Sequence, residues 1–245
     1  LQLKLGRMWL DFWTEFVPRA TRGEPYAILV NGDAIDGVHH GTVTQVSHNL
    51  TDQVRIARDI LEPVVAKAAG GYYHVRGTEA HAGKSGQCEE ELAETLGAVP
   101  TPEGQYARYE LWKHLGGHLV HALHHIDGGG GCEAAAPSRE LQDTWAESAR
   151  WGRRAPDVLV RSHRHRYIKV ATANGRVAGS GRGRVPTTTA MCVVTPGWQG
   201  KTPFAWKTAG GRIRSPQFGG VVISSIGDEL VERSRVWTVG RSKSE

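Results

Sequence analysis

The sequence is poor in cysteine and has no long hydrophobic run. Its 245 residues include only Cys88, Cys132 and Cys192, an odd number without a Cys-x-x-Cys pair, so we expect neither a disulfide framework nor a cysteine-based zinc site. No stretch of about 18 apolar residues occurs, which argues against a membrane-spanning helix. Residues 1–17 carry four charged side chains and lack the apolar stretch of a signal peptide. A reducing, intracellular compartment is therefore expected.

Histidine is missing from both ends of the chain, although the protein contains 12. All of them lie between His39 and His165. Residues 166–245 hold 13 Lys and Arg against 4 Asp and Glu, whereas residues 1–165 hold 17 against 21. Because the length and the hydrophobic fraction of 39% suit one large domain, residues 1–245 are predicted to form a single domain. It would have a histidine-rich body and a basic, β-rich C-terminal part.

Hydrophobic periodicity predicts alternating helices and strands along most of the chain. Helices are predicted over residues 1–17, 50–69, 88–96 and 137–151. Strands are predicted over residues 26–30, 72–76, 157–161, 190–195, 218–226 and 229–236, with a hairpin formed by residues 105–113 and 118–123. Thr51 or Asp52 is the predicted N-cap of the second helix. This order, βαβ units followed by a β-rich end, predicts an α/β sandwich.

Three of the predicted strands end in residues that could bind a metal ion. Gly32–Asp36 follows the first strand, His124–His125 follows the hairpin, and Ser162–His165 follows the strand at residues 157–161. Ligand sites of α/β sheets lie beyond the carboxyl ends of strands, so we expect these segments to meet. Carboxylates and imidazoles without thiolates suit Mn, Fe, Zn or a similar divalent ion.

Each of these motifs alone has a more ordinary explanation. A lone Gly-Asp-x-x-Asp is more often a turn with capping carboxylates, and a lone His-x-His is usually a polar strand end. His124 and His125 could be a core histidine beside an exposed one. Their joint occurrence at three strand ends, in this order along the chain, favours the metal site.

The ordered motifs resemble those of calcineurin-like metallophosphoesterases, in particular the versions found in phage and prophage genomes. That family combines Asp-x-His, Gly-Asp-x-x-Asp, Gly-Asn-His-Asp/Glu, a histidine at a strand end, and Gly-His-x-His. Gly32–Asp36 matches the second element, His124 the fourth, and Ser162–His165 the last with serine for glycine. The resemblance covers about residues 26–237. It implies a four-layer α/β/β/α sandwich and a metal-dependent hydrolase.

The third motif departs from the family pattern. The chain reads Arg76-Gly77-Thr78-Glu79-Ala80-His81, which places Thr78 where the family has its metal-binding asparagine and Glu79 where it has a histidine. His81, two residues further on, offers a replacement imidazole. This Gly-Thr-x-x-His form resembles one seen among phage-type members.

The Asp-x-His motif that opens the family pattern is absent. The early acidic residues Asp11 and Glu15 lie within a predicted helix, and no histidine precedes His39. We expect the first strand and its Asp-x-His to lie upstream of residue 1; an intrinsically incomplete site is the alternative. The residues present would then hold one ion well and a second poorly, with weak metal occupancy and low turnover.

The resemblance implies a ligand set for two divalent ions. Asp33 would bridge them. His163 and His124, with an oxygen from Thr78, would hold one ion, and His165 with the missing Asp-x-His would hold the other. Mn is the expected metal, with Fe, Zn, Ni or Mg as options.

The resemblance also implies catalytic and substrate-binding roles. His81 would donate a proton to the leaving group, and Asp36 would orient a ligand. His125 and Arg164 are predicted to contact the substrate. His39 is predicted to do the same, although a place in a solvated loop is equally compatible with the sequence.

The expected function is that of a cytoplasmic phosphodiesterase or nuclease in a bacterial or phage-infected cell, with no membrane partner. The basic residues of 166–245, among them Arg182, Arg184, Arg212 and Arg214, could reach the phosphates of a nucleic acid or nucleotide. A solvated basic face is the alternative explanation. The alternative function is a catalytically impaired member that acts as a nucleic-acid-binding or assembly module.

Overall fold

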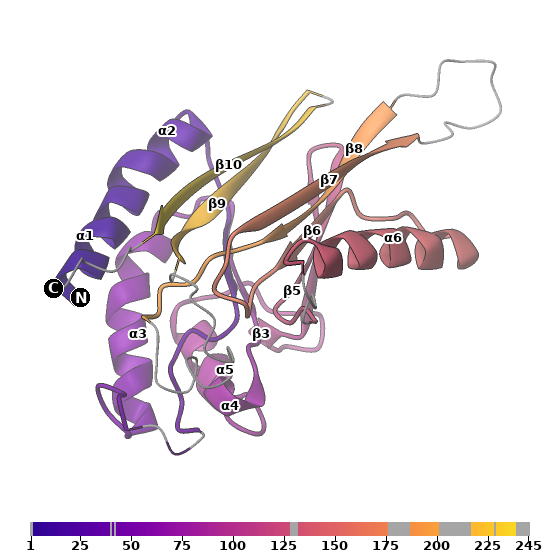
Figure 1. The fold of residues 1–245 in the computed structure, drawn as a ribbon. Helices are drawn as coiled ribbons and strands as arrows, with labels where there is room; N and C mark the ends of the chain where they lie inside the picture. The colour runs from indigo at the N-terminus through magenta and orange to yellow at the C-terminus, as the bar shows by residue number, and fades with distance from the viewer. Residues whose placement is uncertain are drawn as a thin grey trace, which may run out of the picture.

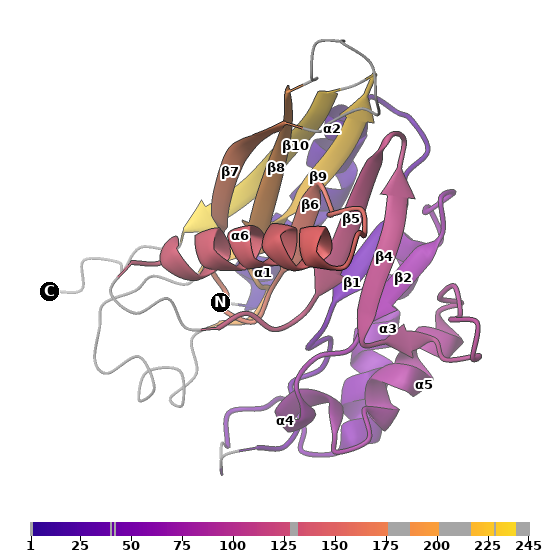
Figure 2. The ribbon, with the colours of Figure 1, turned by 90° about the vertical axis from the view of Figure 1, so that its right-hand side faces the viewer.

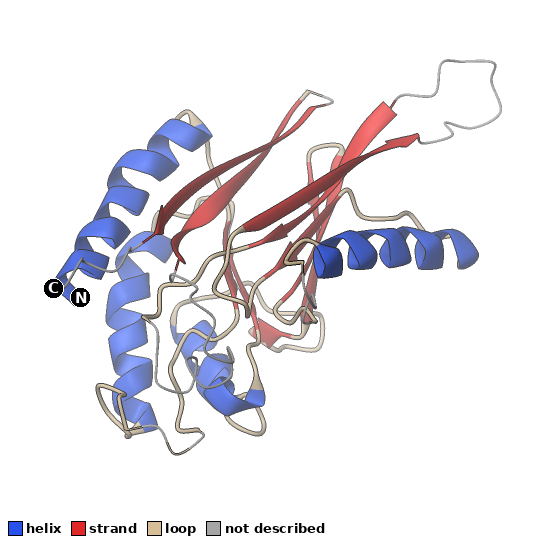
Figure 3. Cartoon of the chain, viewed as in Figure 1, coloured by secondary structure: helices blue, strands red, loops and turns tan. Residues whose placement is uncertain are grey.

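Helices lie at two opposite sides of the molecule, and two layers of strands lie between them (Figures 1 and 3). The computed structural model describes residues 2–39, 41, 43–127, 132–175, 187–200, 217–227 and 229–238. The layers follow the order helix, strand, strand, helix. The predicted four-layer α/β/β/α sandwich is therefore confirmed.

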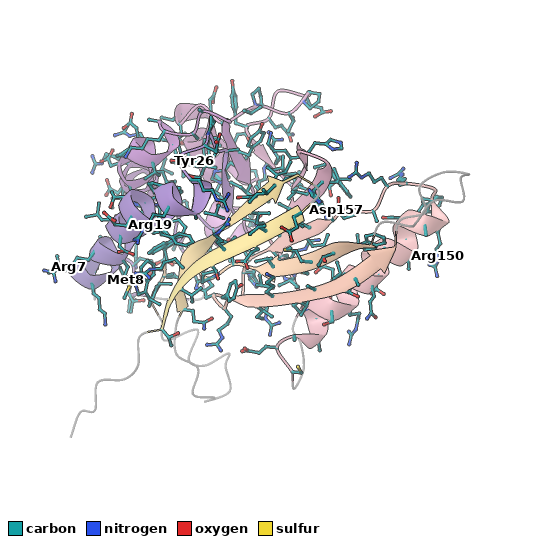
Figure 4. The ribbon with its side chains drawn as sticks, turned by 90° about the horizontal axis from the view of Figure 1, so that it is seen from above. Arg7, Met8, Arg19, Tyr26, Arg150 and Asp157 are labelled. Atoms are coloured by element: carbon teal, nitrogen blue, oxygen red, sulfur yellow. The ribbon has the colours of Figure 1, made fainter. Side chains whose placement is uncertain are left out.

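The chain begins with a continuous helical segment. It consists of α1 (Gln2–Asp11), a π-helical segment η1 (Phe12–Phe16) and α2 (Val17–Thr21), and so extends slightly beyond the predicted helix. Met8 is buried, whereas Arg7 on the same helix is exposed (Figure 4). The segment thus covers the strands with one apolar face.

Three further helices belong to the same outer layer or its edge: α3 (Leu50–Val65), α4 (Glu79–Ala82) and α5 (Gln87–Thr95). The prediction of Thr51 or Asp52 as the N-cap of α3 was wrong. The cap is Asn49, whose side chain accepts a hydrogen bond from the Thr51 backbone N–H at 2.9 Å. The helix α4 was not predicted, because one turn gives no periodic pattern.

The inner layer next to these helices contains five strands. β1 (Ile28–Asn31), β2 (Tyr72–Val75) and β3 (Ala107–Arg108) form a parallel sheet in the order β1-β2-β3. β9 (Gln217–Ile226) and β10 (Glu229–Thr238) form an antiparallel hairpin. The prediction of one strand over residues 105–113 was wrong, since its first part pairs with β2 and its second part belongs to the other layer.

The second strand layer is a five-stranded mixed sheet with the order β4-β5-β6-β8-β7. Its strands are β4 (Glu110–Leu115), β5 (His118–Leu123), β6 (Val158–Arg161), β7 (Ile168–Gly175) and β8 (Thr187–Val194). The helix α6 (Ala135–Arg150) lies across the outer face of this sheet (Figure 2). The strand β7 was not predicted from the sequence.

The strand β6 shows how the layers share one core. Val158 and Val160 point between the two strand layers, where they belong to a cluster that also contains Val75 of β2. Leu159 points the opposite way and packs with Leu141 of α6. Both faces of this central strand are covered, so all four of its residues are buried. They are apolar or, where charged, form an ion pair.

The state of the cysteines and the length of the helices can be compared with the sequence. Cys88 and Cys192 are buried, Cys132 is exposed, and none of the three forms a disulfide. The part of the chain that the structure describes holds no helix long and apolar enough to span a bilayer.

The packing predicts a large effect for a deletion in the core. Leu159 is fully buried, so we expect Leu159→Ala to lower the free energy of unfolding by about 2–5 kcal/mol in urea denaturation. Leu3→Ala is the matched control, because Leu3 is 73% exposed and a surface change of this kind stays within about 0.5 kcal/mol. Equal stability of the two variants would contradict the described packing.

Candidate metal centre

The candidate site lies where the carboxyl ends of strands from both layers meet. Asp33 follows β1, His124 follows β5, and His163 follows β6. Asn31, the last residue of β1, connects the two layers. Its side-chain amide donates to the Leu123 carbonyl at 3.1 Å and to the Ser162 hydroxyl at 2.8 Å. The ends of β1, β5 and β6 are thereby held together.

Backbone strain is concentrated at this site. Four non-glycine residues of the described chain have a positive φ, and three of them are Asp33 (53°), His163 (66°) and His165 (49°). The fourth, Arg22, ends a helix. Left-handed backbone is unfavourable for residues with a Cβ and persists where the surrounding structure enforces it, often at functional sites. The strain therefore supports a functional role for these two loops.

The Asp33 carboxylate has one oxygen engaged by the protein and one facing histidines. Oδ1 accepts hydrogen bonds from the Thr78 backbone N–H at 2.8 Å and from the Thr78 hydroxyl at 3.2 Å. This contact requires glycine at position 77, since a Cβ there would collide with the Asp33 side chain. Thr78 therefore orients the carboxylate and leaves Oδ2 turned toward the imidazoles.

Three histidine nitrogens surround Oδ2 of Asp33. His124 Nε2 lies at 2.9 Å, His81 Nε2 at 3.9 Å and His163 Nδ1 at 4.0 Å. Asp33, His124 and His163 each offer one ligand atom within 4.8 Å of the other two. A carboxylate with two imidazoles is a common donor set for Zn, Fe and other divalent transition metals. These residues fit a resident metal ion.

Hydrogen bonding fixes which nitrogen of His124 faces Asp33. Its Nδ1 lies 2.6 Å from the Asn31 carbonyl oxygen, and because a carbonyl can only accept, Nδ1 carries a proton. In the neutral ring Nε2 then has a lone pair directed at Oδ2, so the two atoms attract each other only through a shared proton or a shared cation. Backbone carbonyls that fix a histidine tautomer in this way are typical neighbours of metal ligands.

The two partners shift each other's pKa in opposite directions. Burial raises the pKa of the Asp33 carboxyl, but the nearby imidazoles of His124, His163 and His81 outweigh this and lower it well below its usual range. Burial lowers the pKa of His124, and the contact with Asp33 outweighs this and raises it. Asp33 therefore stays ionised, as a metal ligand must.

The buried carboxylate of Glu89 was not among the site residues predicted from the sequence. This side chain is fully buried and accepts hydrogen bonds from the backbone N–H of Ala34 at 2.9 Å and of Gly77 at 2.6 Å. His74 lies 3.7 Å from it. Burial raises its pKa, and the hydrogen bonds and charge of these neighbours lower it below the ordinary value. The only signal in the sequence was the acidic first turn of the helix, and acidic residues there are explained equally well by their favourable interaction with the helix dipole.

The other predicted site residues lie around this centre without joining its ligand set. His165 packs against Gly197, and burial lowers its pKa. His125 is exposed, with its ring centroid 4.8 Å from that of His163. Arg164 donates to the Glu133 carbonyl at 3.4 Å. Four arginines named from the sequence, Arg182, Arg184, Arg212 and Arg214, lie outside the described residues.

A second group of metal-ligand residue types lies beside the first. Asp36, His39 and His81 each offer one ligand atom within 4.8 Å of the other two. The structure thus brings together three residues for which separate roles were predicted. The expected Asp-x-His stays a prediction.

The two hydrogen bonds to Glu89 predict a specific dependence of stability on this carboxylate. In Glu89→Gln one amide N–H₂ would face a backbone N–H, so we expect the free energy of unfolding to fall by about 3 kcal/mol. Glu91→Gln is the control, because Glu91 is exposed on the same helix. Urea denaturation that gives the two variants equal stability would contradict the role of Glu89.

The same comparison has a pH signature. Because the Glu89 pKa is lower in the folded protein than its ordinary value of 4.5, its stabilising effect is present above that pH. It is lost as the pH falls toward the lowered value. The difference between wild type and Glu89→Gln should therefore shrink below about pH 4.5.

Comparison with known proteins gives only distant structural likeness. No family model and no curated protein matches the sequence. Vps29 from Entamoeba histolytica, a single mutant, aligns over 94% of this chain and 91% of its own with 12% identity and a TM-score of 0.39. Vacuolar protein sorting 29 from Cryptosporidium parvum aligns over 88% and 98% with 13% identity and a TM-score of 0.36. A hypothetical protein from Thermus thermophilus aligns over 96% and 94% with 14% identity and a TM-score of 0.39. Likeness at this level carries no argument about the activity of the chain.

Proposed function

We propose that this protein is a metal-dependent phosphoester hydrolase of the calcineurin-like metallophosphoesterase kind. The observation that carries the proposal is the convergence of His124 Nε2 and His163 Nδ1 on the Asp33 carboxylate oxygen. The α/β/β/α sandwich and the position of all three residues after strands agree with the motif resemblance. The phage-type assignment rests on the motifs alone.

The residues divide into those that hold an ion and those that position them. Asp33, His124 and His163 would bind a divalent metal, for which Mn is proposed and Fe, Zn, Ni or Mg would also serve. Such an ion supplies a Lewis acid that polarises a phosphoryl oxygen and favours ionisation of water. Thr78 holds the Asp33 carboxylate in one orientation, and the Asn31 carbonyl keeps His124 in the tautomer that binds metal.

The proposed substrate is a phosphodiester of a nucleotide or nucleic acid. His125, whose ring lies 4.8 Å from that of His163, would supply an imidazole to the substrate, and Arg164, the next residue after His163, would supply a guanidinium. A guanidinium pairs well with phosphate oxygens, and the net positive charge of residues 166–245 would attract a polyanion. A cytoplasmic location is proposed with this function, and the three free cysteines are compatible with it.

The proposal predicts that hydrolysis depends on the three ligands. Asp33→Ala and His163→Ala should lower Mn-dependent cleavage of bis(p-nitrophenyl) phosphate by more than about 100-fold. Loss of a residue that only supports a metal ligand costs up to about 100-fold, and loss of a ligand should cost more. The matched control is His48→Ala, because His48 is an exposed histidine of the loop that precedes α3. Its activity should equal that of wild type.

Two results would contradict the proposal. The first is cleavage that both ligand variants retain. The second is a wild-type protein that binds Mn and cleaves neither bis(p-nitrophenyl) phosphate nor p-nitrophenyl phosphate, which would favour the alternative of a non-catalytic binding module.

A further inference from the structure

The group formed by Asp36, His39 and His81 has the same donor set as the centre at Asp33. One carboxylate and two imidazoles place their ligand atoms within 4.8 Å of one another. The side chains of His39 and His81 are only 10% and 15% exposed. The two imidazoles are therefore mostly withdrawn from bulk water, whereas the Asp36 carboxylate is 30% exposed.

The backbone brings the two segments of this group into direct contact. Gly37, at φ +71°, follows Asp36, and a Cβ there would lie 2.6 Å from the Ala80 carbonyl oxygen and 2.7 Å from the His81 Cα. The buried side chain of Gln53 accepts from the Gly37 N–H at 2.7 Å and donates to its carbonyl at 3.1 Å. The loop after β1 therefore packs against α4 at Gly37 and is hydrogen-bonded to α3 through Gln53.

The orientation of His81 leaves one nitrogen for an ion. Its Nδ1 lies 2.7 Å from the backbone carbonyl of Asp36, so Nδ1 carries the proton and Nε2 keeps the lone pair in the neutral ring. The ring meets that of His39 edge to face, with centroids 4.4 Å apart. This is the same arrangement of carbonyl, Nδ1 and Nε2 as in His124.

The Asp36 carboxylate is oriented by a neutral donor. Gln199, from the segment after β8, donates to Oδ1 at 2.6 Å. Within the described part of the chain, the basic side chain at ion-pair distance from this carboxylate is His39, whose Nε2 lies at 3.8 Å. The hydrogen bond from the Gln199 amide thus orients the carboxylate without bringing a positive charge to it.

We propose that Asp36, His39 and His81 form a second divalent-cation site next to the centre at Asp33. The mixed carboxylate and imidazole donors suit Zn, Fe, Co or Mn better than Ca or Mg, which prefer oxygen ligands. As the second half of a two-ion centre, the site rests on the function proposed above. It would replace the Asp-x-His ligands, and His81 would act as a ligand in place of its predicted role as proton donor.

The site changes the expectation of a weakly held second ion. His81 Nε2 lies 3.9 Å from Asp33 Oδ2, so the two groups adjoin at this point. Ions bound by both groups would supply the two-metal chemistry of phosphoester hydrolysis.

The test is the number of Zn ions bound by the full chain after removal of metal with a chelator. Equilibrium dialysis with elemental analysis should give about two ions per chain for wild type and for His48→Ala, and about one for His39→Ala. Asp36→Asn should also bind about one, because the amide can still accept the hydrogen bond from Gln199 but lacks the charge. Circular dichroism and thermal melting establish that each variant is folded.

Three outcomes would overturn the second site. In the first, His39→Ala and Asp36→Asn each still bind two ions per chain. In the second, wild type binds a single ion and both variants retain it. In the third, both variants are folded but bind no ion. Because the readout is ion binding, it separates this proposal from the catalytic one. If wild type shows no hydrolase activity but His39→Ala binds one ion fewer than wild type, the second site is supported and the proposed activity is refuted.

Discussion

A buried carboxylate, that of Glu89, joins the two loops that carry the acidic half of the site. Its oxygens accept the N–H of Ala34, next to Asp33, and the N–H of Gly77, next to Thr78. The loop after β1 and the loop after β2 therefore keep a fixed separation, and Asp33 can meet Thr78 at hydrogen-bond distance. Asn31 makes the corresponding hydrogen-bonded connection between the two strand layers. The convergence of the histidines on Asp33 depends on both connections.

Much of the fold can be predicted from hydrophobic pattern, and the failures of that pattern have physical causes. The helices α3, α5 and α6 are long enough for their apolar face to be read from the sequence. The strand β7 begins with Ile168 and Val170, but the rest of Ile168–Gly175 is small or polar, so its full length at the edge of the sheet depends on pairing with β8. Residues 105–113 cross from one layer to the other, and no local signal marks that change.

The candidate site could be predicted as residue types at strand ends, but its internal geometry could not. Asp33, His124 and His163 were identified because a sheet brings together the loops at the carboxyl ends of its strands. Ser162 departs from the expected glycine, and the structure gives a reason, since its hydroxyl bonds to Asn31 and Thr195. The grouping of Asp36 with His39 and His81 depends on the close approach at Gly37. Contacts between loops of this kind carry no periodic signal in the sequence.

The proposed function requires a metal ion between Asp33, His124 and His163. X-ray diffraction from crystals grown with Zn or Mn, collected at the absorption edge of the metal, measures this directly. We expect an anomalous peak about 2.0–2.2 Å from Asp33 Oδ2, His124 Nε2 and His163 Nδ1 for Zn. If a saturating metal concentration leaves no peak there and His124 Nε2 stays in direct contact with Asp33 Oδ2, the proposed metal site is wrong.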